Sequence, residues 1–148
     1  MILKKTKIVS LIFIFFSKVL ISSDWQRTDM GFSETKIYKL SDGYQVIIYN
    51  SKSFWNDSLG NYGKNKCDGL VKVESNGSFD GGEVYCESTD QNNNNFIVKL
   101  YRDKGDFDGG IGYFIFVKGE GPWKNMVGIK CTYAIKYVDK GFMRLDKC

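Results

Sequence analysis

Alternation of apolar and polar residues is the feature that most limits how this chain can fold. From Ile129 to Tyr137 (IKCTYAIKY), every odd position is apolar or a thiol, and three of the four even positions are polar. A period of two is typical of a β-strand with one buried face, because successive side chains of a strand point to opposite sides. No stretch after residue 23 shows a convincing helical period of 3.6 residues. The sequence therefore predicts an all-β protein.

Shorter runs of the same kind recur along the chain at short, even intervals. Turn signals such as Asp42-Gly43 and Asn76-Gly77 separate them. About eight short strands in up-and-down order predict a single antiparallel barrel, or a barrel-like sandwich, over residues 24–148. The runs are Thr35–Leu40, Tyr44–Tyr49, Leu70–Glu74, Glu83–Cys86, Phe96–Tyr101, Gly112–Val117, Ile129–Tyr137 and Phe142–Cys148.

Two kinds of segment between these runs are expected to be loops. Residues 50–66 are polar and glycine-rich, which is typical of a long loop. The tetrapeptide FDGG occurs twice, at residues 79–82 and 107–110, each time between two strand patterns. Glycine adopts positive φ and aspartate bonds its own following backbone, so both copies are predicted to be turns rather than ligand-holding loops.

Residues 1–23 have the order of a secretory signal. Lysines at positions 4, 5 and 7 precede a largely apolar run over residues 8–16, and small residues follow at Ser22 and Ser23. A membrane anchor is the alternative, but the apolar run is far shorter than the roughly 20 residues of a spanning helix. We expect a cleaved signal, a secreted or periplasmic mature protein, and no membrane span after cleavage.

The net charge of +4 belongs to this N-terminal segment. It carries four of the 21 basic residues and no acidic residue, so 17 basic and 17 acidic residues remain after cleavage. A chain without net charge or a Lys/Arg cluster lacks the electrostatic footprint of a nucleic-acid-binding protein. We expect a monomer that does not bind nucleic acid.

Four cysteines, an even number, lie in the predicted mature chain. In an exported protein they predict two disulfides formed in an oxidising compartment. No two of them are closer than 17 positions, which excludes paired C-x-x-C metal spacing, and we expect neither a metal nor a cofactor. The cysteines are Cys67, Cys86, Cys131 and Cys148.

The pairing of the cysteines follows from the hairpins. Directly opposite residues of an antiparallel hairpin have a constant index sum. The pair Cys67 and Cys86 is centred on the turn signal at residues 76–77, and the pair Cys131 and Cys148 is centred on that at residues 139–140. We therefore predict the disulfides Cys67–Cys86 and Cys131–Cys148 from three alternatives.

This register has a consequence for the last strand. If Cys131 faces inward, Arg144 and Asp146 face inward beside Cys148. Either they form a buried charge pair or the polar floor of a pocket, or a bulge near Gly141 breaks the register.

The chain contains no histidine. This absence excludes Ser-His-Asp and Cys-His catalysis and the usual zinc and copper ligands. Paired carboxylates can hydrolyse substrates without histidine, but no spacing selects a pair. Asp90-x-Asn92-x-Asn94 resembles the start of a calcium loop, yet Tyr101 stands where the bidentate glutamate is required, so a solvated turn is expected.

Aromatic residues make up 16% of the chain, and their simplest role is to fill a small core. Their second role would be to line a pocket at the barrel mouth, where tyrosine hydroxyls orient a small apolar or aromatic ligand. The candidate ligand-binding residues are Tyr113, Trp123, Tyr133, Tyr137 and Arg144.

Residues 109–137, GGIGYFIFVKGEGPWKNMVGIKCTYAIKY, resemble the back half of small secreted β-barrels of the allene oxide cyclase-like and lipocalin-like types. The shared pattern is a glycine-rich strand, G-x-G-x-[WF], a short excursion to Gly128, and an alternating strand bearing tyrosine. The resemblance implies a barrel and no particular activity.

Three functions remain open, and each makes a structural prediction. A non-catalytic module that binds a small apolar ligand or a protein partner is favoured by the missing catalytic motifs. A cyclase, isomerase or hydrolase using carboxylates or tyrosine requires a buried carboxylate of raised pKa inside a cavity. An inhibitor or adhesion module acting through its loops predicts a solid core and an exposed aromatic patch at Phe54, Trp55 and Tyr62.

Overall fold

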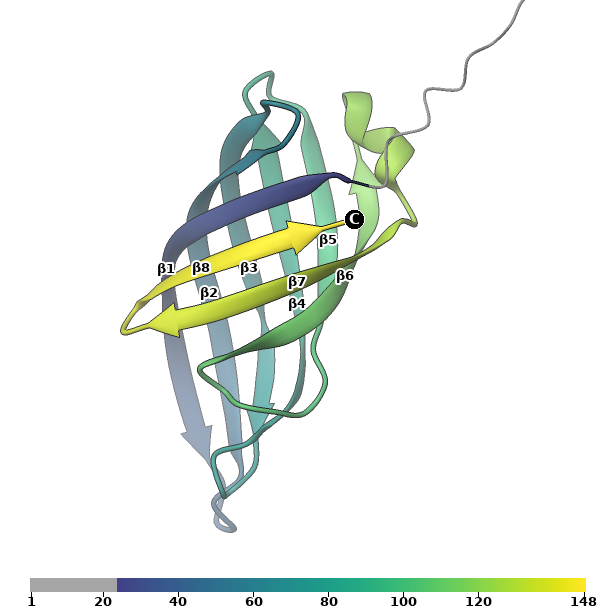
Figure 1. Ribbon diagram of the computed structural model, residues 1–148. Coiled ribbons are helices and arrows are strands. Elements are labelled where there is room, and N and C mark those ends of the chain that lie inside the picture. Colours follow the sequence, from purple (N-terminus) through teal and green to yellow (C-terminus); the bar gives the residue numbers. More distant parts are fainter. Residues whose placement is uncertain (1–23) are drawn as a thin grey trace, which may run out of the picture.

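The structure is a computed structural model that describes residues 24–148. Eight antiparallel strands form a closed barrel in which each strand pairs with the next and β8 pairs with β1 (Figure 1). The predicted all-β, up-and-down barrel is confirmed. The strands are β1 (Gln26–Lys39), β2 (Gln45–Asp57), β3 (Tyr62–Val73), β4 (Phe79–Asp90), β5 (Asn95–Tyr101), β6 (Gly109–Gly119), β7 (Lys130–Val138) and β8 (Gly141–Lys147), and the 3-10 helix η1 (Gly121–Met126) precedes β7.

The two ends of the barrel differ. The end drawn uppermost in Figure 1 carries η1, the C-terminus and the turns after β2 and β4. The lower end carries the turns after β1 and β3, and the loop of residues 102–108 and the turn after β7 lie above them on the barrel side in Figure 1. These two ends are called the upper and lower ends below.

The barrel wall is incomplete near the lower end. Strand β1 pairs with β8 only from Gln26 to Phe32, and the amide of Ser33 donates to the carbonyl of Lys140 at 2.8 Å. Beyond that bond, residues 34–39 pair with β2 alone among the described strands. The lower half of β1 therefore borders a lateral opening.

Both predicted disulfides are present, Cys67–Cys86 between β3 and β4 and Cys131–Cys148 at the upper end. The register of β7 with β8 runs unbroken from Thr132 opposite Lys147 to Val138 opposite Gly141. Of the two alternatives for the last strand, the buried charge pair is therefore correct.

The long loop expected over residues 50–66 is wrong. Strand β2 continues to Asp57 and β3 starts at Tyr62, which leaves a turn of residues 58–61. The inward-facing residues here include Ser51, Ser53 and Asn65, all buried. Because these inward-facing residues are polar, the sequence here does not alternate between apolar and polar residues, and the strands were not recognised.

The FDGG segments are turns only in part. The first copy is the start of β4, where the register shifts between Lys72 and Val73, so that Asp80 has no partner and Gly81 takes a φ of 111°. In the second copy Phe107 and Asp108 end a loop, and the two glycines begin β6. Glycine at the first site serves a β-bulge rather than a hairpin corner.

The upper half of the interior is filled with aromatic rings. Trp123 of η1 reaches down onto Phe96, with ring centroids 4.4 Å apart, and onto Trp55 at 5.8 Å. Trp25 closes the cluster against Phe116 at 6.0 Å. This cluster is the filled core that the aromatic content predicted as its simplest role, but it occupies one end of the barrel only.

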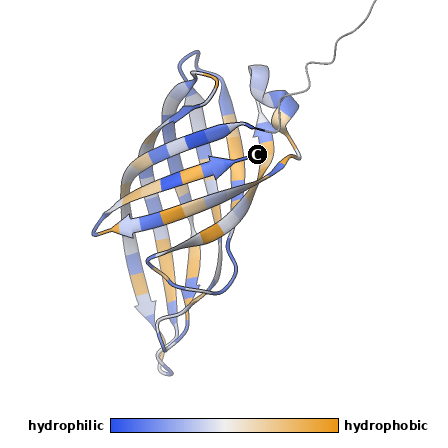
Figure 2. Cartoon of the chain, viewed as in Figure 1, coloured by the Kyte–Doolittle hydropathy of each residue, from blue (hydrophilic) through white to orange (hydrophobic). Residues whose placement is uncertain are grey.

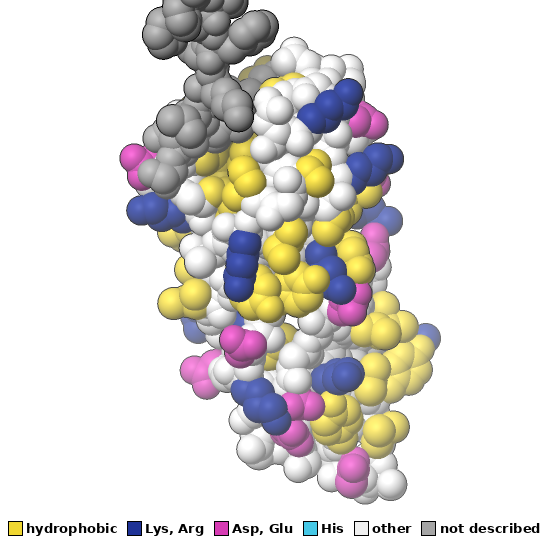
Figure 3. Space-filling model, turned by 90° about the vertical axis from the view of Figure 1, so that its right-hand side faces the viewer, with side chains coloured by type: hydrophobic (Ala, Val, Ile, Leu, Met, Phe, Trp, Pro, Cys, Tyr) yellow, Lys and Arg dark blue, Asp and Glu magenta, His cyan; other side chains and the backbone are white. Residues whose placement is uncertain are grey.

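Hydrophilic and hydrophobic residues alternate along most strands in Figure 2, as the two-faced strand pattern requires. Lys/Arg and Asp/Glu side chains are interspersed over the face shown in Figure 3, and neither sign of charge gathers there. That face carries no basic patch.

Candidate functional site

The lower half of the barrel encloses a cavity of about 430 Å³. This volume lies within the range of small-molecule sites, roughly 300–1,000 Å³. Its apolar walls come from six strands and the loop of residues 102–108. The lining side chains include Tyr49, Ser51, Cys67, Val71, Phe79, Val84, Leu100, Arg102, Phe107, Tyr133, Ile135, Tyr137, Lys140, Phe142 and Arg144.

The lower half carries glycines at inward-facing positions where the upper half carries aromatic rings. On β6, Phe114 and Phe116 fill the upper interior, whereas the preceding inward positions are Gly110 and Gly112. Gly82 plays the same part on β4, where it lines the cavity. Of these glycines, Gly82 borders the empty volume directly, whereas the space at Gly112 is taken by the ring of Tyr133.

Tyr133 depends on one of these glycines. It lies directly opposite Gly112 in the register of β6 with β7. A Cβ at Gly112 would lie 2.6 Å from the Tyr133 hydroxyl oxygen and 2.4 Å from the backbone oxygen of Tyr101. Glycine therefore lets the tyrosine ring lie against β6.

The cavity is floored by a buried ionic network of two arginines and two aspartates. Arg27 Nε donates to Asp146 Oδ2 at 2.8 Å, and Arg144 Nη2 donates to Asp29 Oδ2 at 2.9 Å. Each arginine also contacts the other carboxylate: Arg27 Nη2 lies 3.4 Å from Asp29 Oδ2, and Arg144 Nε lies 3.0 Å from Asp146 Oδ1 without hydrogen-bond geometry. Every one of the four residues is 2% exposed or less. Their formal charges cancel, as burial demands.

Neutral groups tie the network to β3 and β4. Asn65 Nδ2 donates to Asp29 Oδ2 at 3.0 Å, and the Ser88 hydroxyl donates to Asn65 Oδ1 at 2.8 Å. Asn65 Nδ2 also lies 3.3 Å from Cys67 Sγ. On its upper side, the Arg27 guanidinium lies 5.7 Å from the ring centroid of Trp55. The network thus separates the aromatic upper core from the cavity.

Burial shifts the acid groups of the network. It raises the pKa of Asp146 to about 6, although Arg27 opposes the shift. Burial raises the pKa of Asp29 as well, again against the attraction of Arg27. Of the four network residues, Arg144 lines the cavity and the carboxylates do not. The buried carboxylate of raised pKa that the enzyme alternative requires is present, but Arg144 lies between it and the cavity.

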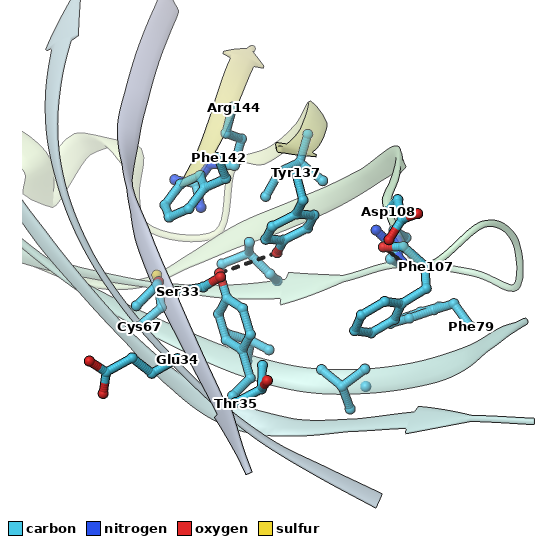
Figure 4. Close-up of a pocket in the computed structure, with 18 of the residues that line it drawn as sticks. Ser33, Glu34, Thr35, Cys67, Phe79, Phe107, Asp108, Tyr137, Phe142 and Arg144 are labelled. Carbon is cyan, nitrogen blue, oxygen red and sulfur yellow. Dashed lines mark hydrogen bonds between the residues drawn. The ribbon is translucent and has the colours of Figure 1, made fainter. Parts of the chain in front are cut away.

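Three tyrosines line the cavity. The Tyr137 hydroxyl donates to the Tyr49 hydroxyl at 3.2 Å, and the two rings meet edge to face (Figure 4). Burial raises the pKa of Tyr137 and of Tyr49, and raises that of Tyr133 to about 12. All three hydroxyls therefore keep their protons at neutral pH.

The mouth of the cavity is aromatic and charged. Phe79 and Phe107 lie close together at the end away from Arg144 and Phe142, and both come from FDGG segments (Figure 4). The Arg102 guanidinium carbon lies 3.9 Å from the Phe79 ring centroid, and its Nη2 donates to the backbone oxygen of Asp106 at 3.1 Å. Glu34, Asp108, Asp139 and Lys140 complete the rim beside the lateral opening.

The structure brings three of the five candidate ligand residues together. Tyr133, Tyr137 and Arg144 line one cavity. Tyr113 lies on the outer side of β6, where it stacks on Tyr101 with ring centroids 4.9 Å apart. Trp123 belongs to the upper cluster, on the other side of the ionic network.

Sequence reasoning missed Tyr49, Ser51 and Arg102. Tyr49 could have been found, because it ends a run in which alternate residues face inward. Ser51 was hidden in the segment mistaken for a loop. Arg102 follows the last residue of β5, and only the path of the following loop places it at the mouth.

Asp90 has a structural role in the turn after β4, whose sequence resembles the start of a calcium loop. Its Oδ1 accepts from the amides of Asn92 and Asn94 at 2.8 and 2.9 Å, and its Oδ2 accepts from the indole of Trp123 at 2.9 Å. Both oxygens are therefore engaged. No group of three or more potential metal ligands occurs within residues 24–148.

No protein-family model matches the chain, and neither curated proteins nor solved structures gave a match. The barrel implied by the resemblance of residues 109–137 is present, but a family is not shown. The two disulfides indicate an oxidising, extracytoplasmic environment. Among residues 24–148, no helix has the length and apolar character needed to cross a membrane.

Proposed function

We propose that this protein is a non-catalytic binding module that holds a small apolar or aromatic ligand in the lower half of its barrel. The observation that carries the proposal is the cavity of about 430 Å³ between the ionic floor and the two phenylalanines of the mouth. An interior that is packed at one end and hollow at the other suits a bound molecule, since native cores otherwise leave few voids larger than water.

The oxidising environment that the two disulfides indicate agrees with a secreted or periplasmic binding protein. The face shown in Figure 3 carries interspersed charges and no basic patch, so it offers no support for nucleic-acid binding. The enzyme alternative is less well supported because the buried carboxylates do not line the cavity. The adhesion alternative predicted a solid core, and Trp55 of its expected patch is buried, although Phe54 and Tyr62 are exposed.

A thermal-shift screen tests the proposal. Fatty acids, sterols and aromatic compounds are added to the purified protein, and we expect one class to raise the unfolding midpoint. Leu100→Trp is the matched control, because it fills the cavity from β5 without touching the ionic network. The proposal fails if no compound shifts the wild-type midpoint, or if the same compounds shift Leu100→Trp equally.

A further inference from the structure

The polar groups inside the cavity are hydrogen-bond donors in excess. Beside Ser33 and Thr35 of β1, the lining polar side chains away from the charged rim are the hydroxyls of Tyr49, Ser51, Tyr133 and Tyr137 and the guanidinium of Arg144. No carboxylate or carboxamide lines this part of the described structure. Every acidic lining residue lies at the rim, and Glu34 points away from the cavity centre in Figure 4.

Arg144 donates to Asp29 and Asp146, but several of the hydroxyls have no acceptor within the described chain. The bond between the hydroxyls of Tyr137 and Tyr49 uses one of their two protons and leaves the other free. The Ser51 hydroxyl is buried without a hydrogen-bond partner within residues 24–148. Tyr133 lines the cavity, and its hydroxyl makes no hydrogen bond within residues 24–148. A ligand that brings an acceptor would satisfy groups that are costly to leave unpaired.

The charge of the floor selects among acceptors. Arg144 is the cation that reaches the cavity, and its charge is balanced within the network by Asp29 and Asp146. The tyrosines are neutral. A ligand carboxylate at the floor would therefore bring an uncompensated buried charge, whereas a carbonyl oxygen would accept the same hydrogen bonds without one.

The cations at the rim do not alter the preference of the floor for a carbonyl over a carboxylate. Arg102 is held over Phe79 and bonded to the backbone of its own loop. Lys140 lies beside Asp139 on the turn after β7. Both are at the mouth, where an apolar ligand tail would lie against Phe79 and Phe107.

We propose that the ligand is a compact apolar or aromatic molecule bearing a neutral carbonyl. The carbonyl end lies deepest in the cavity, where its oxygen accepts hydrogen bonds from Tyr133 and the Tyr49–Tyr137 pair. This inference rests on the proposed function, because it names the chemical class of the ligand in the same cavity.

Three naphthalenes of nearly equal shape test the inference by calorimetric titration at pH 7.5. 2-Acetylnaphthalene carries a neutral carbonyl, 2-isopropenylnaphthalene replaces that oxygen by carbon, and 2-naphthoate carries an anion. We expect the wild-type protein to bind the ketone at least about tenfold more tightly than the naphthoate. Tyr133→Phe should weaken ketone binding by about three- to tenfold, the worth of one hydrogen bond, and leave the isopropenyl compound unchanged.

Tyr113→Phe is the matched control, since it removes a hydroxyl from the outer face of the barrel and should leave all three affinities unaltered. The infrared carbonyl stretch of the bound ketone gives a second readout, expected to move to lower frequency in the wild type and back in Tyr133→Phe. Tightest binding of the naphthoate, or equal losses of ketone and isopropenyl affinity in Tyr133→Phe, would overturn the inference while leaving the binding function intact. If none of the three compounds binds and the screen above is also negative, both proposals fail.

Discussion

The absence of a side chain at position 112 determines where the ring and hydroxyl of Tyr133 can lie. Any side chain there would meet the backbone oxygen of Tyr101 and the end of the Tyr133 ring. The backbone oxygen belongs to the paired strand and cannot move without disturbing the sheet. Gly112 therefore acts on the site through Tyr133 rather than through a ligand.

We predict that Gly112→Ala lowers the free energy of unfolding by about 1–3 kcal/mol, the usual cost of overpacking, and abolishes preference for a carbonyl ligand. Urea denaturation and ligand titration measure the two effects. Gly105→Ala is the control, because a Cβ there would meet nothing within 4 Å. Equal stability of the two variants would contradict the close approach described for Gly112.

At the scale of the elements, each hairpin joined by a disulfide is also joined by turn chemistry and strand pairing. The two bridges span similar sequence separations, 19 and 17 residues. They differ in position, since Cys67 lines the cavity beside Asn65 and Cys131 does not line it.

We predict that removing either bridge by paired Cys→Ala substitutions lowers the free energy of unfolding by about 3 kcal/mol, because loops of this length lose similar entropy when closed. Only the Cys67→Ala, Cys86→Ala protein should also lose ligand affinity. Urea denaturation and ligand titration of the two double variants test this. Equal ligand affinities in both double variants would mean that the Cys67–Cys86 bridge does not help to shape the cavity.

Strands with an apolar inner face were predictable from their alternation, whereas the polar inner faces of β2 and β3 hid how far these strands extend. Strand β8, whose inner face carries Arg144 and Asp146, was predicted from its turn and its cysteine. Strand β7 shows its period of two because Cys131, Tyr133 and Ile135 all face the interior. Across β2 and β3, the inner face turns toward the ionic network and carries Ser51 and Asn65 instead. A strand with polar residues on both faces has the composition of a loop. The prediction of strands from alternation was therefore wrong for the parts of β2 and β3 that lie beside the ionic network.

For the molecule as a whole, the ionic network makes stability depend on pH. Burial raises the pKa of Asp146 to about 6 and shifts Asp29 in the same direction. A carboxyl group whose pKa is higher in the folded chain binds its proton more tightly when folded. Its contribution is therefore complete below the unfolded pKa of about 3.9 and is lost as the pH rises through the folded value.

We predict that the free energy of unfolding, measured by urea denaturation, falls by up to about 3 kcal/mol between about pH 4 and pH 7. Asp146→Asn should reduce this slope, although it also lowers stability by leaving the arginines less well balanced. Asp90 affects stability in another pH range. Burial raises its pKa, but hydrogen bonds from Asn94 and Trp123 outweigh burial and lower the pKa. The stability that Asp90 contributes is therefore lost only as the pH falls below the ordinary pKa of an aspartate. A slope unchanged in Asp146→Asn would contradict the assignment.

The sequence by itself determined the strands with apolar inner faces, the turn dipeptides between them and both disulfides, because these depend on neighbours within one hairpin. It also placed Arg144 and Asp146 on the inner face of β8 through the index sum of Cys131 and Cys148. Closure was needed to bring Arg27 and Asp29 of the first strand against them, since β1 and β8 meet only when the barrel is complete. Whether the interior is hollow was likewise decided by the tertiary structure, because a cavity is the volume that all eight strands together leave unfilled.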